Sequence, residues 1–183
     1  MILPIYVYGH PILRRQAADV SLTEENLKTL IEDMYETMYH ANGVGLAAPQ
    51  IGKSLRIFVI DSAPYKEFYP NEDARKITFI NPTITTRTGE EFPFNEGCLS
   101  LPEIHEDVMR QPAIDITYFD ETLTQKTEHF EGVLARIIQH EYDHIEGMVF
   151  TDKLSSLKKM ILKRKLSDIA SGKTKPGYKI KNQ

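Results

Sequence analysis

The sequence predicts an α+β fold, in which antiparallel or mixed β-sheets pack around a buried central helix and one further helix lies toward each end of the chain. Segments with strand and helix patterns do not alternate regularly, which argues against a doubly wound parallel sheet. The segment 133–146 is apolar on most of its faces, as a helix buried inside a domain is. A length of 183 residues, with 41% apolar and 26% charged residues, is typical of one soluble domain.

The first half of the chain predicts one helix and one buried strand. Residues 21–24, Ser-Leu-Thr-Glu, form a capping-box pattern that predicts a helix start. Asn42 and Gly43 are expected to end this helix. The apolar run 55–61 predicts a largely buried strand, and the polar segment 61–76 predicts a loop or an insertion. The apolar residues of the helix recur at helical spacing, at Leu27, Leu30, Ile31, Met34 and Met38.

The second half predicts three strands and two helices. A strand over 77–84 is interrupted by the Asn-Pro pair at 81–82, and the alternating segment 113–119 predicts a half-buried strand. A turn at 120–121 lets residues 123–130 return as its hairpin partner. The central helix is expected from about Val133 to Glu146, with Gly132 before it and Gly147 after it, and a third helix from about Asp152 to Ala170.

Cysteine content and hydropathy exclude two classes of protein. Cys98 is the single cysteine, so an intrachain disulfide framework is excluded, and a reduced compartment, the cytoplasm, is expected. No apolar run approaches the ~20 residues that span a bilayer, so we expect no membrane partner. The first ten residues have neither the basic start of a signal peptide nor the composition of a transit peptide.

The charge is distributed unevenly. Residues 153–183 contain ten Lys or Arg and one acid, Asp168, which gives this segment +9 and leaves −13 on the rest of a chain whose net charge is −4. A basic C-terminal helix and tail on an acidic body suggests a polyanionic partner. The alternative is a solvated helix face followed by a frayed terminus.

A metal-binding pattern lies on the predicted central helix, at His140-Glu141-Tyr142-Asp143-His144. Two histidines four residues apart lie on one helix face, so both imidazoles can reach one ion. Glu141 is placed to contact a metal-bound water without coordinating the metal. The alternative is an ordinary histidine pair without a ligand.

A catalytic metal needs three protein ligands and one open position, so a third ligand must come from elsewhere. We prefer Cys98, because Gly97 lets the backbone approach closely, Pro102 stiffens the exit, and a thiolate binds borderline metals strongly. A lone cysteine can also be a small buried hydrophobe. The other candidates are His10, His40, His105 and His129.

Three segments resemble the signature motifs of peptide deformylases, in the order that this family has them. They are Gly-Val-Gly-Leu-Ala-Ala-Pro-Gln at 43–50, Glu-Gly-Cys-Leu-Ser at 96–100 and Gln-His-Glu-Tyr-Asp-His-Ile-Glu-Gly at 139–147. The similarity extends from Pro4 to about Lys153. It implies a catalytic domain at 1–152 that removes the N-formyl group from the formyl-methionine of newly made polypeptides.

The resemblance also implies the roles of individual residues. Glu141 is the general base and later the general acid, while the Gln50 side chain and the Leu99 N–H stabilise the oxyanion. The metal is Fe²⁺ in the cell, with Zn²⁺, Ni²⁺ or Co²⁺ as substitutes, and it lowers the pKa of bound water toward ~7, giving metal-bound hydroxide. Its implied ligands are Cys98, His140 and His144.

The first side chain of the substrate needs an apolar pocket beside the metal. Motif position and helix phase place four residues there, although the helix pair could be plain core. Gly43 and Gly45 are expected to let the substrate backbone pass closely, or else simply to form a helix stop and a turn. The expected pocket residues are Val44, Phe94, Val133 and Ile137.

Several neighbours of the motifs are also informative. Glu96 is expected to orient a ligand histidine, and Asp143 to pair with Arg110, which resembles a family arginine. His105 stands where bacterial relatives often carry an arginine that meets the substrate.

Two rival functions are a metallopeptidase and a metal-stabilised RNA-binding module. The peptidase would need a third His or Glu ligand downstream, where the chain offers only Asp152 and Asp168 after Glu146. We expect no DNA partner, a monomer, and ribosome contact through the basic tail, which some bacterial deformylases make.

Overall fold

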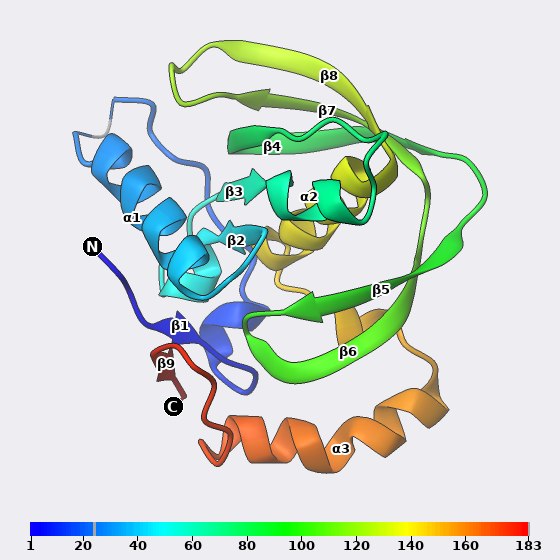
Figure 1. Ribbon diagram of the computed structural model, residues 1–183. Coiled ribbons are helices and arrows are strands. Elements are labelled where there is room, and N and C mark those ends of the chain that lie inside the picture. The colour runs from blue at the N-terminus through cyan, green and yellow to red at the C-terminus, as the bar shows by residue number, and fades with distance from the viewer. Residues whose placement is uncertain (24, 183) are drawn as a thin grey trace.

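The computed structural model describes residues 1–23 and 25–182, and it confirms the predicted α+β class (Figure 1). Its largest sheet is antiparallel and has five strands in the order β2-β3-β4-β7-β8. The strands are β1 (Ile5–Tyr6), β2 (Gly45–Ala47), β3 (Ile57–Asp61), β4 (Lys76–Thr88), β5 (Phe92–Cys98), β6 (Leu101–Arg110), β7 (Ala113–Phe119), β8 (Gln125–Glu131) and β9 (Ile180–Lys181). The α-helices are α1 (Leu27–His40), α2 (Gly132–Ile145) and α3 (Ser156–Ala170), and the short 3-10 helices are η1 (Pro11–Arg14), η2 (Ala48–Ile51), η3 (Ala63–Glu67) and η4 (Phe150–Lys153).

The strand β3 supplies apolar side chains to both faces of this sheet. Phe58 and Ile60 pack in the cluster that contains the apolar residues of α2. Ile57 and Val59, which point to the opposite face, pack in the cluster of α1. The continuous apolar run in the sequence therefore follows from helices covering the strand on both sides.

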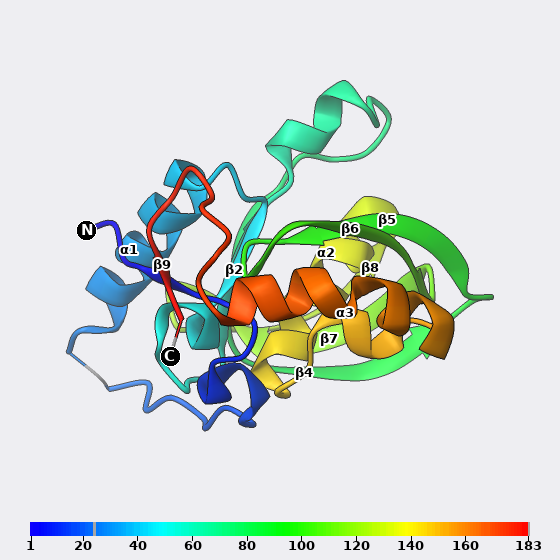
Figure 2. The same ribbon diagram turned by 90° about the horizontal axis from the view of Figure 1, so that it is seen from below.

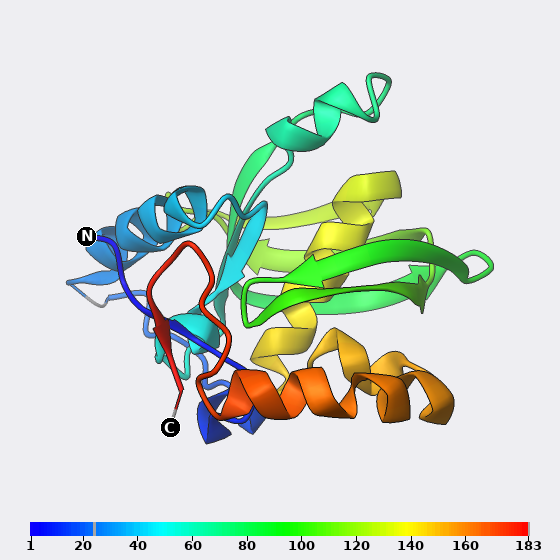
Figure 3. The same ribbon diagram turned by 60° about the horizontal axis from the view of Figure 1, so that its bottom comes forward.

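The helix α2 is the buried central helix that the sequence predicts. It begins at Gly132 and is followed by Gly147, and both glycines have positive φ, 61° and 76°. One side of α2 packs on the five-stranded sheet, and its other side contacts the β5–β6 hairpin through Arg136 and His140. The metal-binding motif therefore lies in the interior, between two layers of strands (Figure 3).

The hairpin formed by β5 and β6 has no counterpart among the predicted elements. The two strands pair antiparallel from Phe92 and Arg110 to Gly97 and His105, after which the register shifts. Most of β5 is exposed, and its one fully buried residue is Glu96. Without an alternating apolar pattern, a strand of this kind cannot be recognised from its sequence.

The predicted boundaries differ from the structure at two helix starts. α1 begins at Leu27 after Asn26, rather than directly after 21–24; the Ser21 hydroxyl accepts a bond from the Thr23 N–H, and Glu24 lies outside the described residues. α3 begins at Ser156 rather than near Asp152, because residues 150–153 form a 3-10 turn first. The Ser155 hydroxyl caps α3 by accepting from the Lys158 N–H at 3.3 Å.

The strand predicted over 77–84 is part of the longer β4. Asn81 adopts a positive φ of 48°, and the pairing with β7 shifts register between Ile80 and Thr83. The Asn-Pro pair thus makes an irregularity in the strand and does not end it. The hairpin predicted from 113–119 and 123–130 is present as β7 and β8.

The strands β1 and β9, from opposite ends of the chain, lie side by side (Figure 1). α3 packs on the body through Leu162, Leu166 and Ile169, and the tail beyond it returns so that β9 pairs in parallel with β1. The segment 61–76 projects from the body between β3 and β4 (Figures 2 and 3). Within the described residues, no helix combines the length and the apolar character needed to cross a membrane.

Candidate active site

Three potential metal ligands meet between the end of β5 and the helix α2. The ligand atoms of Cys98, His140 and His144 all lie within 4.8 Å of one another. Cys98 Sγ is 3.2 Å from His144 Nε2. The cysteine reaches the helix because it is the last residue of β5, where the hairpin turns beside α2.

The other histidines considered as third ligand do not join this group in the structure. His10 Nδ1 accepts a bond from the Ile12 N–H at 3.2 Å and caps a turn. His40 is exposed at the end of α1. His129, on the outer strand β8, pairs with Asp115 of β7 and Glu131 of β8. His105 lines the same cavity but is not part of the cluster.

The residues present fit a bound metal ion. One sulfur and two imidazoles form a donor set that suits zinc, iron and related divalent metals. Among the described residues, the buried side-chain atoms without a hydrogen-bond partner are Glu141 Oε2 and His144 Nδ1, and both belong to this site. Unpaired buried polar atoms are rare. The Glu141 carboxylate faces the cavity, so its unpaired oxygen suits a polar group bound there. His144 Nδ1 lies on the ring edge opposite Nε2, the nitrogen that is near Cys98, and it does not bear on the metal.

A buried network of charges orients His140. Its Nδ1 lies 2.9 Å from Glu96 Oε2, which leaves Nε2 free to face the cluster. Arg110 donates to Glu96 Oε1 at 2.7 Å and to Asp143 Oδ2 at 2.7 Å, so the ion pair expected between Arg110 and Asp143 is present. Burial by itself raises the pKa of a carboxyl, but hydrogen bonds from His140 and Arg110 hold the pKa of Glu96 at about 2.

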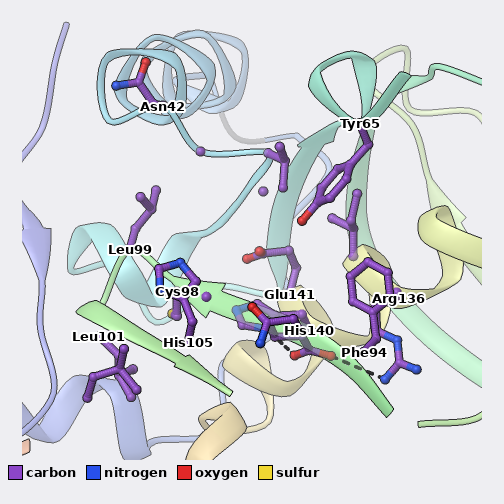
Figure 4. Close-up of a pocket in the computed structure, with 18 of the residues that line it drawn as sticks. Asn42, Tyr65, Phe94, Cys98, Leu99, Leu101, His105, Arg136, His140 and Glu141 are labelled. Atoms are coloured by element: carbon purple, nitrogen blue, oxygen red, sulfur yellow. Dashed lines mark hydrogen bonds and ion pairs between the residues drawn. The ribbon is translucent and has the colours of Figure 1, made fainter. Parts of the chain in front are cut away.

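Glu141 has the opposite environment. Its side chain is buried, and burial without a cationic hydrogen-bond partner raises its pKa to about 7. Figure 4 shows the carboxylate projecting into the cavity, between the side that carries Cys98 and the side that carries Tyr65. A carboxyl with a pKa near neutrality can both accept and release a proton at physiological pH.

The side chain of Gln50 is fixed beside the cluster. Its Oε1 accepts from the Ala47 N–H at 2.8 Å, which directs the amide nitrogen toward the β5–β6 turn. Nε2 donates to Ser100 Oγ at 3.1 Å and lies 3.6 Å from Cys98 Sγ. The amide nitrogen therefore faces the group of potential ligands.

The cluster opens into a cavity of about 780 Å³ (Figure 4). Its wall includes Gln50, Cys98, Leu99, His140 and Glu141. The residues predicted around the substrate mostly line it as well, namely Gly43, Val44, Gly45, Phe94 and Ile137.

Val133 is the exception among the predicted pocket residues. It is buried in the core, where it packs in the cluster between the sheet and α2, and it is not among the cavity-lining residues. Its N–H donates to Glu72 Oε2 of the insertion at 3.2 Å. Helix phase was right, but Val133 lies two turns from His140, at the far end of the helix.

Several wall residues were not predicted. Tyr65, Phe68 and Tyr69 come from the insertion, which arches over one side of the cavity. Arg136 lies one helical turn before His140, a spacing that could have identified it, and it donates to the carbonyls of Phe92 and Val108. Tyr178 comes from the C-terminal tail, and no local pattern in the sequence points to it.

Comparison with known proteins places these features in a family. A family model described as polypeptide deformylase matches residues 2–160. The chain is 52% identical to the peptide deformylase of Flavobacterium johnsoniae, over 99% of this chain and 96% of that relative. Among solved structures, it is similar to the peptide deformylase of Legionella pneumophila, with a TM-score of 0.83 and 40% identity over 94% of this chain and 98% of that one. The peptide deformylase of Thermus thermophilus is similar with a TM-score of 0.81 and 40% sequence identity, over 92% of this chain and 98% of that one.

Proposed function

This chain belongs to the polypeptide deformylase family, and we propose that it hydrolyses the formamide C–N bond of the N-terminal formyl-methionine of newly made polypeptides. One observation carries the proposal within the structure. The ligand group of Cys98, His140 and His144 lies beside the unpaired, buried carboxylate of Glu141 on the wall of an open cavity. That arrangement suits hydrolysis of an amide.

Cys98, His140 and His144 would hold the metal, which we propose to be Fe²⁺ in the cell, with Zn²⁺, Ni²⁺ or Co²⁺ able to replace it. When bound, such a metal acts as a Lewis acid and lowers the pKa of water toward ~7. Glu96 keeps His140 in the tautomer that presents Nε2. Ferrous iron and a thiolate are both sensitive to oxidation. Metal analysis of anaerobically purified protein therefore tests which metal is bound.

Glu141 moves the proton in this proposal. Its carboxylate takes a proton from the attacking water and later gives it to the nitrogen of the leaving amine. Burial raises the pKa of Glu141 in the metal-free site, and a bound cation beside it would lower the pKa again, which favours the carboxylate form that accepts the proton.

Gln50 and Leu99 would stabilise the negative charge that develops on the formyl oxygen. The Gln50 amide is held in place from both ends, by Ala47 and by Ser100, so it needs no reorganisation during the reaction. The Leu99 N–H lies in the turn that follows Cys98. Losing one such donor typically reduces kcat by ~10²–10³.

Substrate would enter along the cavity. Val44, Phe94 and Ile137 offer apolar surface to the methionine side chain, and the segment Gly43–Gly45 offers main-chain hydrogen-bonding groups to an extended peptide. Val133 has no place in this proposal.

The direct test compares formyl-Met-Ala with unformylated Met-Ala, using wild-type protein and Glu141→Ala. We expect wild-type protein to release formate and the variant to lose ~10²–10⁴ of kcat while retaining its metal. Glu90→Ala, which changes an exposed acid, is the matched control. Cleavage of an internal peptide bond in an unformylated peptide would favour the metallopeptidase instead, and a fully active Glu141→Ala would contradict the role of Glu141.

We further propose that the basic tail contacts the ribosome and that the protein acts as a monomer in the cytoplasm. On α3, Leu157, Met160 and Ile161 are 62%, 65% and 68% exposed, although they are apolar. They share the outer surface of the helix with exposed lysines and an arginine, a composition that suits a polyanionic surface.

Co-sedimentation with ribosomes tests this contact. Reversing the charges of Lys163, Arg164 and Lys165 to Glu should abolish binding that weakens with salt. A matched reversal at the exposed residues Lys28, Lys53 and Arg87 should leave it intact. Equal binding by both variants would rule the contact out.

A further inference from the structure

The turn that carries the proposed site atoms lies at an irregular end of its hairpin. Leu99 and Ser100 form this turn, directly after Cys98. The regular pairing of β5 and β6 ends at Gly97 and His105, and the register then jumps to Cys98 and Leu101. The hairpin holds the turn through the single pair Cys98 and Leu101, and contacts from outside the hairpin add to it.

Both carbonyls of this turn are bound by the two ends of the chain. The hydroxyl of Tyr178 donates to the Leu99 carbonyl oxygen at 2.8 Å. The N–H of Tyr8 donates to the next carbonyl, that of Ser100, also at 2.8 Å. Burial raises the pKa of Tyr178, so its hydroxyl keeps its proton and remains a donor at physiological pH.

The tail holds Tyr178 firmly enough to fix another group. Two residues beyond it, β9 pairs in parallel with β1, and the N–H groups of Ile5 and Val7 donate to the carbonyls of Lys179 and Lys181 at 2.9 and 3.0 Å. Figure 1 shows these strands side by side near both chain ends. The side chains of Tyr178 and Leu99 also pack against the same apolar cluster.

We propose that Tyr178 is a positioning residue for the reaction, acting through its hydrogen bond to the Leu99 carbonyl. It fixes the turn so that Leu99 and Cys98 keep their places on the wall of the cavity. The C-terminal tail is then part of the catalytic site as well as a basic appendage. This inference rests on the proposed deformylase function, because the Leu99 N–H matters only if an oxyanion forms beside it.

Tyr178 also lines the cavity, so a direct contact with substrate is the competing explanation. The two explanations differ in their kinetics. A group that orients an oxyanion donor affects the transition state and lowers kcat, whereas a group that binds the ground state raises KM. A merely structural group changes the stability and leaves both constants unchanged.

The test is Tyr178→Phe, which removes the hydroxyl and keeps the ring. We expect kcat for formyl-Met-Ala to fall about three- to tenfold, as suits the loss of one neutral hydrogen bond, with KM within about twofold of wild type. In the metal-free protein, hydrogen–deuterium exchange of the peptide covering residues 97–103 should become faster. Tyr118→Phe is the matched control, since it removes a buried hydroxyl that donates to Glu128 on the outer strand.

The outcomes separate the possibilities. Lower kcat together with faster exchange at 97–103, both absent in Tyr118→Phe, supports the proposal. Unchanged kcat overturns it, whatever the exchange shows, and a raised KM with unchanged kcat assigns Tyr178 to substrate binding instead. If wild-type protein releases no formate, the proposed function fails. Exchange then still reports whether Tyr178 holds the turn.

Discussion

Gly45 shows how one missing side chain can decide whether the proposed general base fits. A Cβ atom built at this position would overlap the carboxylate of Glu141. At Gly43 the nearest atom is Leu99 Cδ1, 2.7 Å from such a Cβ, and it is the tip of a flexible side chain. The two glycines of the motif thus make room for different site residues. Gly45 makes room for the Glu141 carboxylate, which must keep its position, and Gly43 makes room for the Leu99 side chain, which can move.

If Glu141 transfers the proton as proposed, we predict that Gly45→Ala lowers kcat by ~10² or more, because the displaced carboxylate would no longer reach the reacting atoms efficiently. Gly43→Ala should have a much smaller effect, since the Leu99 side chain can rotate away. Steady-state kinetics on formyl-Met-Ala, with metal content measured in parallel, compares them. Equal losses in both variants would argue against this account of the motif.

At the scale of elements, Arg110 joins the β5–β6 hairpin to α2. Its side chain is 3% exposed and bridges Glu96 of β5 and Asp143 of α2. The network holds the hairpin that ends in Cys98 against the helix that carries both histidines. Removing the arginine would take away the nearest guanidinium from two buried carboxylates, leaving Arg136 at 3.5 Å from Glu96 and Lys153 at 3.7 Å from Asp143.

We therefore expect Arg110→Ala to lower the free energy of unfolding by about 3–5 kcal/mol, measured by urea denaturation of the metal-free protein. Arg14→Ala is the control, because it breaks an ion pair whose side chains are 45% and 37% exposed, and such pairs contribute about 0–1 kcal/mol. The number of metal ions bound per protein molecule should stay close to that of wild type in Arg110→Ala, although the free energy of unfolding falls. An unfolding midpoint equal to wild type would contradict the prediction.

Asp120 stabilises the turn of the β7–β8 hairpin, and this stabilisation depends on pH. Asp120 Oδ1 accepts from the N–H groups of Thr122 and Thr124, and Lys126 pairs with Oδ2 at 2.9 Å. These contacts, led by the hydrogen bond from the Thr122 side chain, lower its pKa below the ordinary value of 3.8. Because folding favours the charged form, Asp120 contributes stability above that ordinary pKa and loses it as the pH falls through the lowered one.

Asp120→Ala should accordingly lower the free energy of unfolding at pH 7. This deficit in unfolding free energy relative to wild type should shrink as the pH is lowered below about 4. Urea unfolding at several pH values measures the deficit. Glu121→Ala, at the adjacent exposed acid, is the control and should show no comparable pH-dependent deficit. A deficit at pH 7 that persists unchanged in acid would mean that charge is not responsible.

At the scale of the whole molecule, the metal would join segments that are far apart in the sequence. A ligand that binds only the folded state stabilises it by mass action, by about 4 kcal/mol at a concentration 1,000-fold above Kd. Removing the metal with a chelator should therefore lower Tm, as measured by calorimetry. Cys98→Ser should show a much smaller change on chelation, and an equal drop in both proteins would place the stabilising ion elsewhere.

The tail has two proposed roles that one deletion would confuse. Removing residues 155–183 would remove the basic surface of α3 and also Tyr178 with its bond to Leu99. Charge reversal on α3 and Tyr178→Phe separate them, because the first leaves the turn intact and the second leaves the charge intact.

The elements that the sequence predicted well are those with strong periodicity. The helix at 133–146 and the hairpin at 113–130 were placed to within a few residues, since each buries a regular apolar face. The β5–β6 hairpin was not predicted, because the buried residues that anchor it include Glu96 and Arg110, and paired charges carry no apolar pattern.

The sequence by itself determined which side chains are able to bind a metal or accept a proton, because these properties belong to residue types at short spacings. The oxyanion donors followed only from the resemblance to peptide deformylases. Tertiary structure alone decided which residues meet. It excluded Val133 from the cavity, added the aromatic residues of the insertion, and brought Tyr178 to Leu99. These contacts depend on how distant segments pack, and local sequence patterns do not encode that packing.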